Sequence, residues 1–276
     1  AKNKAEDITR VLYPNDSTWE GKRLRLKQQY VLSSASLQDM LRTYKLSHGN
    51  DLSRFGEFYA VQLNDTHPAM SIPELIRLLM NEGYSFDEGF EIARKTFSYT
   101  NHTVLGEALE KWPLNLMRSV VPQIADIICK IDHKMRTEIP MDFQERRTKK
   151  LFIIDEDIVH MANLSIYVGS YVNGVAEIHS QILKDDCFKD WYHAFPERFQ
   201  NKTNGITPRR WVGLCNPELV GMIREKVGAD FLKNLDEIGA LKGMIDDELI
   251  GRFNFIKHQK KEQLCAVIAK REGIQL

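Results

Sequence analysis

The sequence predicts a helix-rich α/β protein. Long stretches with apolar residues three and four positions apart cover much of the chain, and this spacing is typical of amphipathic helices. Short apolar runs rich in aromatic and β-branched residues lie between them and are typical of buried strands. The chain has no internal repeat and no low-complexity segment, so its 276 residues can form one sizeable core or two smaller ones.

The first expected elements are a long helix and a strand. Apolar residues at helical spacing predict an amphipathic helix over residues 22–45, and the His-Gly-Asn-Asp turn at residues 48–51 ends it. The run Phe-Tyr-Ala-Val-Gln-Leu at residues 58–63 predicts a buried strand. Because polar residues 64–68 follow directly, we expect polar groups to leave the carboxyl end of this strand.

Two helices with capping boxes are expected next. Ser71 precedes Glu74 by three positions, and Ser85 precedes Glu88 in the same way, which is the spacing of a capping box at a helix start. The second of these helices should end before a second polar loop at residues 99–103. Polar loops therefore recur after successive elements.

The rest of the chain gives weaker signals. The charged residues 143–150 are most simply a solvated face or a linker. Thr207-Pro208 and Asn216-Pro217 each place a capping residue before a proline, which predicts two helix starts. The other expected elements are helices over residues 105–116, 124–135, 175–183 and 247–271 and a strand over residues 151–154.

Composition and charge exclude several classes of protein. Lys plus Arg and Asp plus Glu both number 38, so no net charge attracts a nucleic acid or an anionic membrane. No apolar run approaches the ~18 residues that a membrane span requires. The four cysteines form no CxxC pair and the polar first ten residues form no signal peptide. We therefore expect a cytoplasmic protein with no nucleic-acid or membrane partner.

Three loops concentrate side chains that bind hydroxyl groups or phosphates. Their amides, hydroxyls and imidazoles are short donors and acceptors, which suit a polyhydroxylated ligand such as a sugar if the loops converge on one cleft. Taken singly, each loop is more often a capped turn. The three loops are residues 64–67, 100–103 and 201–205.

Other chemistries have less support. Asp65 and His67 resemble half of a metal site, which His102, His160 or His179 could complete. A loop histidine with an ordinary hydrogen-bond partner is the simpler interpretation, and we expect no metal. Glycine-rich phosphate loops and the GxSxG nucleophile motif do not occur.

Arg209 and Arg210 open a predicted helix, where positive charge opposes the helix dipole. They could clamp a phosphate or another anion, because guanidinium groups bind such groups bidentately. Pairing with neighbouring carboxylates explains them equally well, and both interpretations stay open.

Five blocks of the sequence resemble the α-glucan phosphorylases, the family of glycogen, starch and maltodextrin phosphorylase, and they occur in the family's order. The resemblance covers essentially the whole chain. It implies a two-domain glycosyltransferase-B fold, with residues 1–205 in the later part of the N-terminal domain and residues 206–276 at the start of the C-terminal domain. The blocks are VLYPND at 11–16, QLNDTHP at 62–68, YTNHTVL at 99–105, VNGVA at 172–176 and NKTNGITPRRW at 201–211.

The resemblance also implies an activity. Family members transfer a terminal α-1,4-linked glucosyl unit from a glucan to phosphate, and pyridoxal phosphate relays protons through its own phosphate group. His102 and Asn204 match the pair that holds the 6-hydroxyl of the reacting glucose, and the His102 carbonyl matches a group beside the developing positive charge. The other matching residues are Asp65, His67, Glu107 and Ala108 near the glucose, Asn15, Asp16 and Ser17 in a mobile loop over the entrance, and Trp211 near the cofactor.

The family's cofactor lysine motif and its phosphate-binding basic block are absent. The resemblance therefore implies an internal fragment of an allosteric, dimeric enzyme, with Arg10 at the end of a helix that takes part in dimer contacts. Because pyridoxal phosphate needs a lysine amine for its Schiff base, we expect the isolated chain to be inactive. The alternative is a non-catalytic carbohydrate-binding or assembly module.

Overall fold

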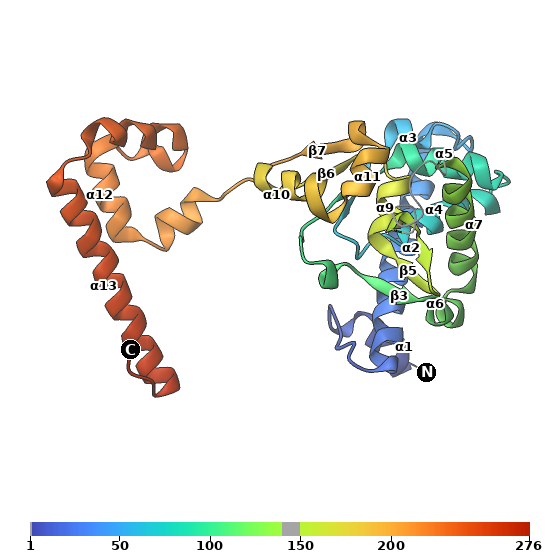
Figure 1. Ribbon diagram of the computed structural model, residues 1–276, viewed down its shortest axis with the longest axis horizontal. Helices are drawn as coiled ribbons and strands as arrows, with labels where there is room; N and C mark the ends of the chain where they lie inside the picture. Colours follow the sequence, from blue (N-terminus) through green and yellow to red (C-terminus); the bar gives the residue numbers. More distant parts are fainter. Residues whose placement is uncertain (1, 140–149) are drawn as a thin grey trace. The chain divides into compact units, whose positions relative to one another are not determined.

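The computed structural model describes residues 2–139 and 150–276 (Figure 1). These residues form two compact units, Ala1–Asn204 and Gly205–Leu276. The assignment of residues 1–205 and 206–276 to two domains of a larger phosphorylase stays a prediction. Of the charged stretch expected to be a solvated face or linker, only Lys150 lies among the described residues.

A parallel four-stranded sheet lies at the centre of the first unit. Its strand order is β1-β2-β6-β7, and neighbouring strands are parallel throughout, with Leu63 opposite Tyr99 and Val172 opposite Phe199. This arrangement confirms the helix-rich α/β class, because parallel strands require crossover segments that are usually helical. The strands are β1 (Val61–Asn64), β2 (Phe97–Thr100), β6 (Val172–Gly174) and β7 (Phe199–Asn201).

Helices fill every crossover between these strands. Figure 1 shows them packed around the sheet. A small antiparallel sheet, in the order β3-β5-β4, interrupts the crossover from β2 to β6. The crossover elements are α4 (Ser71–Asn81), α5 (Phe86–Thr96), η1 (Gly106–Ala108), β3 (Lys111–Pro113), α6 (Leu114–Val120), α7 (Pro122–Glu138), β4 (Ile154–Asp155), β5 (Ile158–His160), α9 (Met161–Val168), α10 (Glu177–Ile182), the π-helix η2 (Leu183–Cys187), α11 (Lys189–Ala194) and η3 (Pro196–Arg198).

A helical segment precedes the sheet. After α1 (Lys2–Arg10), the long helix α2 (Trp19–His48) confirms the helix predicted over residues 22–45, and α3 (Phe55–Phe58) follows. The strand predicted over residues 58–63 begins only at Val61, because Phe58 ends α3 and Tyr59 is its C-cap. Helix α2 packs against α4 and α6, so its apolar face joins the main core.

The two predicted capping boxes have different outcomes. At α5 the prediction is confirmed, because Ser85 Oγ accepts the Glu88 N–H and Glu88 Oε2 accepts the Ser85 N–H at 2.8 Å. At α4 it is wrong, because Ser71 is already the first helical residue and makes no capping bond. Glu74 is fully buried and instead accepts hydrogen bonds from Arg77 at 2.7 Å and Ser34 at 2.6 Å.

Several predicted elements in the middle of the chain are wrong in type or length. Residues 105–116 do not form one helix, since a 3-10 turn and the strand β3 precede α6. The strand predicted over residues 151–154 is reduced to β4, which starts at Ile154. The helix predicted over residues 124–135 is confirmed as α7, and that over residues 175–183 as α10 with the π-helix after it.

The second unit contains helices joined by short connections, and no strand among the residues that the structure describes. Its small core contains Val220, Ile223 and Phe231 together with Leu249 from the last helix. Leu264, on the same helix, is exposed. The elements are the π-helix η4 (Arg209–Leu214), α12 (Pro217–Val227), η5 (Asp230–Leu232), η6 (Leu235–Met244) and α13 (Asp247–Glu272).

Both helix starts predicted in the second unit occur, but without the expected caps. Pro217 opens α12, whereas the side chain of Asn216 donates to the Trp211 carbonyl at 2.8 Å and caps nothing. The π-helix follows Pro208 without a side-chain cap. Arg209 and Arg210 are exposed, and neither forms an ion pair with a described carboxylate.

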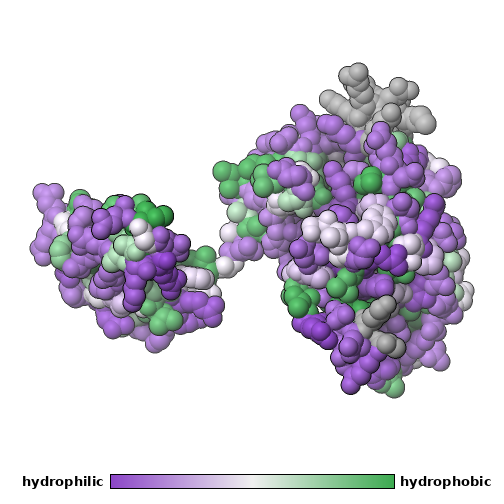
Figure 2. Space-filling view, turned by 90° about the horizontal axis from the view of Figure 1, so that it is seen from below, coloured by the Kyte–Doolittle hydropathy of each residue, from purple (hydrophilic) through white to green (hydrophobic). Residues whose placement is uncertain are grey.

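The visible face of the molecule in Figure 2 is mostly hydrophilic, with separate apolar areas. In the first unit the exposed apolar side chains include Val11, Leu12 and Tyr13, which follow α1 directly. No helix in the described part of the chain is both long enough and apolar enough to cross a membrane.

Candidate functional site

The three polar loops leave one edge of the central sheet. Residues 65–67 follow β1, which ends at Asn64, residues 101–103 follow β2, and residues 202–204 follow β7. Because the strands are parallel, their carboxyl ends lie at the same edge, which is where open α/β sheets bind ligands. The structure therefore places at one edge the loops that the sequence indicated separately.

Polar side chains tie the strand ends together. Gln62 Nε2 donates to Thr100 Oγ1 at 2.8 Å, and Thr100 Oγ1 donates to Asn173 Oδ1 at 2.9 Å. These bonds join β1, β2 and β6, and Asn173 is only 8% exposed. Asn173 lies within the VNGVA block, but no role was predicted for it from the sequence.

Asn101 fixes the backbone before and after His102. Asn101 is fully buried, and its N–H donates to the Asn173 carbonyl at 3.0 Å. Its side-chain oxygen accepts the Thr103 N–H at 3.1 Å, and its side-chain nitrogen donates to the Tyr99 hydroxyl at 3.0 Å. Burial raises the pKa of Tyr99 well above its ordinary value, so this hydroxyl stays protonated.

His102 itself is exposed at the sheet edge. Its Nε2 forms a hydrogen bond with Asn64 Oδ1, which links the loops after β1 and β2. Its carbonyl oxygen accepts no hydrogen bond from any residue that the structure describes. A fixed carbonyl dipole is therefore left free to act on a ligand.

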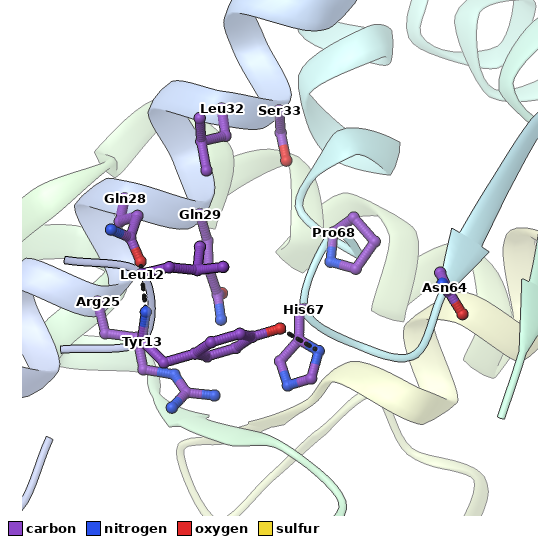
Figure 3. Close-up of a pocket in the computed structure, with 10 residues that line it drawn as sticks. All are labelled: Leu12, Tyr13, Arg25, Gln28, Gln29, Leu32, Ser33, Asn64, His67 and Pro68. Atoms are coloured by element: carbon purple, nitrogen blue, oxygen red, sulfur yellow. Dashed lines mark hydrogen bonds between the residues drawn. The ribbon is translucent and has the colours of Figure 1, made fainter. Parts of the chain in front are cut away.

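Asp65 and His67 occupy different positions in the first loop. Asp65 has a φ of 66°, and its carboxylate accepts the Thr66 N–H at 2.7 Å, so it is half-buried in a tight turn. His67 Nδ1 lies 3.5 Å from the Tyr13 hydroxyl, and the two rings meet edge to face (Figure 3). Tyr13 belongs to the VLYPND block but was not predicted to be a site residue.

A cavity of about 230 Å³ adjoins His67. Figure 3 shows Tyr13 lying between Arg25 and His67, and the Arg25 guanidinium is 5.3 Å from the centre of the Tyr13 ring. The cavity combines an apolar side with amide and imidazole groups, which is the usual chemistry of a small-ligand site. Its lining residues are Leu12, Tyr13, Arg25, Gln28, Gln29, Leu32, Ser33, Asn64, His67 and Pro68.

The predicted entrance loop is packed onto the start of α2. Asn15 Oδ1 accepts the Ser17 N–H at 2.9 Å, and Asp16 lies 3.5 Å from Arg25. A Cβ atom on Gly21 would clash with the Asn15 carbonyl oxygen, so only glycine allows this close approach. Arg25 thereby connects the predicted loop to the cavity beside His67.

The remaining predicted residues are not brought to this cavity. Glu107 and Ala108 are exposed in η1 and do not line it. Trp211 belongs to the second unit, where 63% of its surface is exposed. Among the described residues, no group of three or more His, Cys, Asp or Glu side chains is placed to share a metal ion.

Asn204 ends the first unit with a fixed backbone and a free side chain. Its N–H donates to the Val175 carbonyl at 2.9 Å. Its side chain is exposed and makes no hydrogen bond with a described residue. The amide is therefore available to a ligand without breaking an internal contact.

Comparison with known proteins assigns the family. A family profile described as "Carbohydrate phosphorylase" matches residues 1–276, so the chain belongs to the carbohydrate phosphorylase family. Over 289 aligned residues it is 42% identical to the muscle form of glycogen phosphorylase from Homo sapiens and from Mus musculus, and 43% identical to the brain form from Bos taurus. Each alignment covers 100% of this chain and 34% of the relative.

The chain thus spans about a third of the length of these relatives. The predicted resemblance to the glucan phosphorylases is confirmed, as is the expectation that the chain corresponds to part of such a protein. The roles of the individual site residues stay predictions.

Proposed function

We propose that this chain forms part of an α-1,4-glucan phosphorylase, which transfers the terminal glucosyl unit of glycogen or maltodextrin to phosphate and releases glucose 1-phosphate. Family membership and the names of its relatives support this activity. The structural observation that carries the proposal is the free His102 carbonyl at the same sheet edge as the free amide of Asn204.

His102 and Asn204 bind the 6-hydroxyl of the reacting glucose in this proposal. They follow β2 and β7, which are separated by one strand, so their loops start about 10 Å apart at the usual strand spacing. A hydroxyl both donates and accepts, and an imidazole and an amide can satisfy both functions. Asp65 and His67, together with Glu107 and Ala108, are proposed to lie near the same sugar.

The His102 carbonyl supplies the electrostatic part of the mechanism. Cleavage of a glucosyl bond develops positive charge at the anomeric carbon, in an oxocarbenium-like transition state. A carbonyl dipole held in place by Asn101 stabilises that charge more strongly than the neutral ground state, which lowers the barrier. No reorganisation is needed, because the peptide is already fixed.

Pyridoxal phosphate is expected in full-length members of the family, where it supplies proton transfer through its phosphate. The residues that the structure describes do not form a site for it by themselves. Lys202 is the lysine of the loops that follow the four parallel strands, and its exposed side chain makes no hydrogen bond or ion pair with a described residue. Trp211 is a proposed neighbour of the cofactor, but an indole cannot form a Schiff base.

Further expectations rest on the family alone. We propose that Asn15, Asp16 and Ser17 border the entrance to the site. We also propose that the complete protein is a cytoplasmic homodimer under allosteric control. Glucan and phosphate are its proposed substrates.

The test is a phosphorolysis assay on the full-length protein. With maltodextrin and phosphate, the wild type should release glucose 1-phosphate, and His102→Ala and Asn204→Ala should each lower kcat/KM about tenfold, since the loss of one good hydrogen bond corresponds to that factor. His133→Ala and Asn81→Ala are matched controls, because both side chains are exposed on helices. Wild-type turnover in both site variants would overturn the assigned roles, and absence of product with the wild type would overturn the activity.

The isolated chain tests the expected lack of a cofactor lysine, and the full-length protein separates this proposal from a binding module. After incubation with pyridoxal phosphate and borohydride reduction, mass analysis should find no stable adduct on a single lysine. Maltooligosaccharide binding without turnover by the full-length protein would favour a non-catalytic carbohydrate-binding module instead.

A further inference from the structure

Two side chains at the start of α10 join the loops after β6 and β7. His179 Nδ1 accepts the Val175 N–H at 3.0 Å, and the carbonyl of the same Val175 accepts the Asn204 N–H at 2.9 Å. Beside it, Ser180 Oγ donates to Asn201 Oδ1 at 2.9 Å. The backbone of Asn204 is thus connected to the His179 imidazole through two hydrogen bonds, which meet at Val175.

The approach of α10 to the sheet depends on Gly174. A Cβ atom at this position would lie 2.6 Å from Ser180 Oγ and 2.8 Å from His179 Nδ1, which are distances that real Cβ atoms do not show. Gly174 also accepts the Lys202 N–H through its carbonyl at 3.2 Å. The end of β6 therefore contacts both α10 and the loop that follows β7.

The other ring nitrogen of His179, Nε2, indicates that this residue does more than stabilise the fold. Because Nδ1 accepts a hydrogen bond, the proton is on Nε2, and this buried N–H has no partner among the described residues. A buried donor without a partner opposes folding. The contact that the imidazole does make is the one to the peptide of Val175.

We infer that His179 is a positioning residue for the sugar site, which holds the peptide of Val175 and through it the backbone of Asn204. This inference rests on the proposed function, because it assigns His179 to the orientation of the amide that binds the 6-hydroxyl. Ser180 supports the same loop through Asn201. The role of His179 is therefore in substrate discrimination at carbon 6.

The experiment measures discrimination by the full-length enzyme in the direction of glucan synthesis. The donors are glucose 1-phosphate and its 6-deoxy analogue, with maltoheptaose as acceptor, and the readout is the ratio of their kcat/KM values. A site built to bind a hydroxyl rejects the analogue that lacks it, so the wild type should prefer glucose 1-phosphate strongly. His179→Leu should reduce this preference roughly tenfold, chiefly by slowing the normal donor.

Two variants separate positioning from general stability. In His179→Asn, the side-chain oxygen can replace Nδ1 as acceptor, so the preference should stay within about threefold of the wild type. In an Asn204→Ala background, His179→Leu should not change the ratio further, because the amide that it positions is gone. Ser180→Ala should lower the preference in the same direction and serves as the second test if His179→Leu does not fold.

The outcomes distinguish the two proposals. Equal loss of rate with both donors in His179→Leu, or an unchanged ratio in a folded variant, would overturn the positioning role while leaving the phosphorylase activity in place. If the wild type transfers no glucosyl unit from glucose 1-phosphate, the proposed function fails. A wild type that transfers glucose but shows no preference would overturn the inference and the assignment of His102 and Asn204 to the 6-hydroxyl, while leaving the phosphorylase activity in place.

Discussion

Asn101 allows a direct measurement of how firmly the His102 peptide is held. Asn101→Ala removes the side-chain bonds to Tyr99 and Thr103 and keeps the backbone bond to Asn173. Because Asn101 is fully buried, water cannot replace the lost partners without a rearrangement of the core. The substitution therefore leaves buried polar groups unpaired.

The expected loss of stability follows from these contacts. Two hydrogen bonds contribute about 1 kcal/mol each in net terms. The buried Tyr99 hydroxyl then lacks a partner, which adds about 1–3 kcal/mol. Since these contributions overlap, we expect Asn101→Ala to lower the free energy of unfolding of the first unit by about 2–4 kcal/mol.

The assay is urea unfolding of the chain, followed by tryptophan fluorescence. A Trp211→Phe background removes the signal of the second unit, so that buried Trp112 and Trp191 report on the first. Tyr99→Phe is the matched control, because the double variant with Asn101→Ala leaves no hydroxyl without a partner. The double variant should lose about 1 kcal/mol less unfolding free energy than the sum of the losses in the two single variants. A loss below about 1 kcal/mol in Asn101→Ala, or strict additivity, would refute this account.

Three further predictions concern the helices. Ser85→Ala should destabilise the chain by about 1 kcal/mol in the same urea assay, because it removes the cap of α5, and Ser85→Thr should retain most of the stability. Hydrogen bonds from the backbone N–H of Ser85 and, to a smaller extent, from its hydroxyl lower the pKa of Glu88. The ionised Glu88 carboxylate therefore stabilises the fold above the ordinary glutamate pKa, and this stabilisation is lost as the pH falls through the lowered pKa. Stability should therefore fall less between pH 6 and pH 3 in Glu88→Gln, and an unchanged profile would contradict this cause. Glu74→Ala should cost about 3 kcal/mol, because it leaves the Arg77 guanidinium without its partner, and a cost below about 1 kcal/mol would show that this buried pair is dispensable.

The long helices could be predicted from the sequence, whereas most of the strands could not. Helices α2, α7 and α13 are long enough for the helical period to repeat several times. Strands β6 and β7 have three residues each, and such short runs show no period. They become strands because parallel neighbours pair with them, which is a long-range contact that a local pattern does not contain.

The candidate site shows the same division. The polar residues after β1, β2 and β7 were visible in the sequence as three separate loops, but the strand order that brings their ends to one edge was not. Tyr13 and Arg25 join the site through side-chain contacts across α2, far from the loops in sequence. His179 was noted only as a possible metal ligand, although its visible partner is a backbone N–H. A single imidazole gives no sequence signal for a contact of that kind.

Two groups of residues differ in burial and in their internal hydrogen bonds. One group is proposed to touch the sugar, and the other holds the first in place. Asn204 is exposed and its amide makes no internal bond, so it is free to exchange water for a hydroxyl. Asn101 and Asn173 are buried, and their side chains are bonded within the sheet edge, so they keep the backbone in place before any ligand arrives. Substitution of a binding residue should therefore lower activity with little change in stability, whereas substitution of a holding residue should lower both. We therefore expect the same amide group to bind ligand where it is exposed and to hold the backbone where it is buried, a difference in depth that the sequence pattern does not contain.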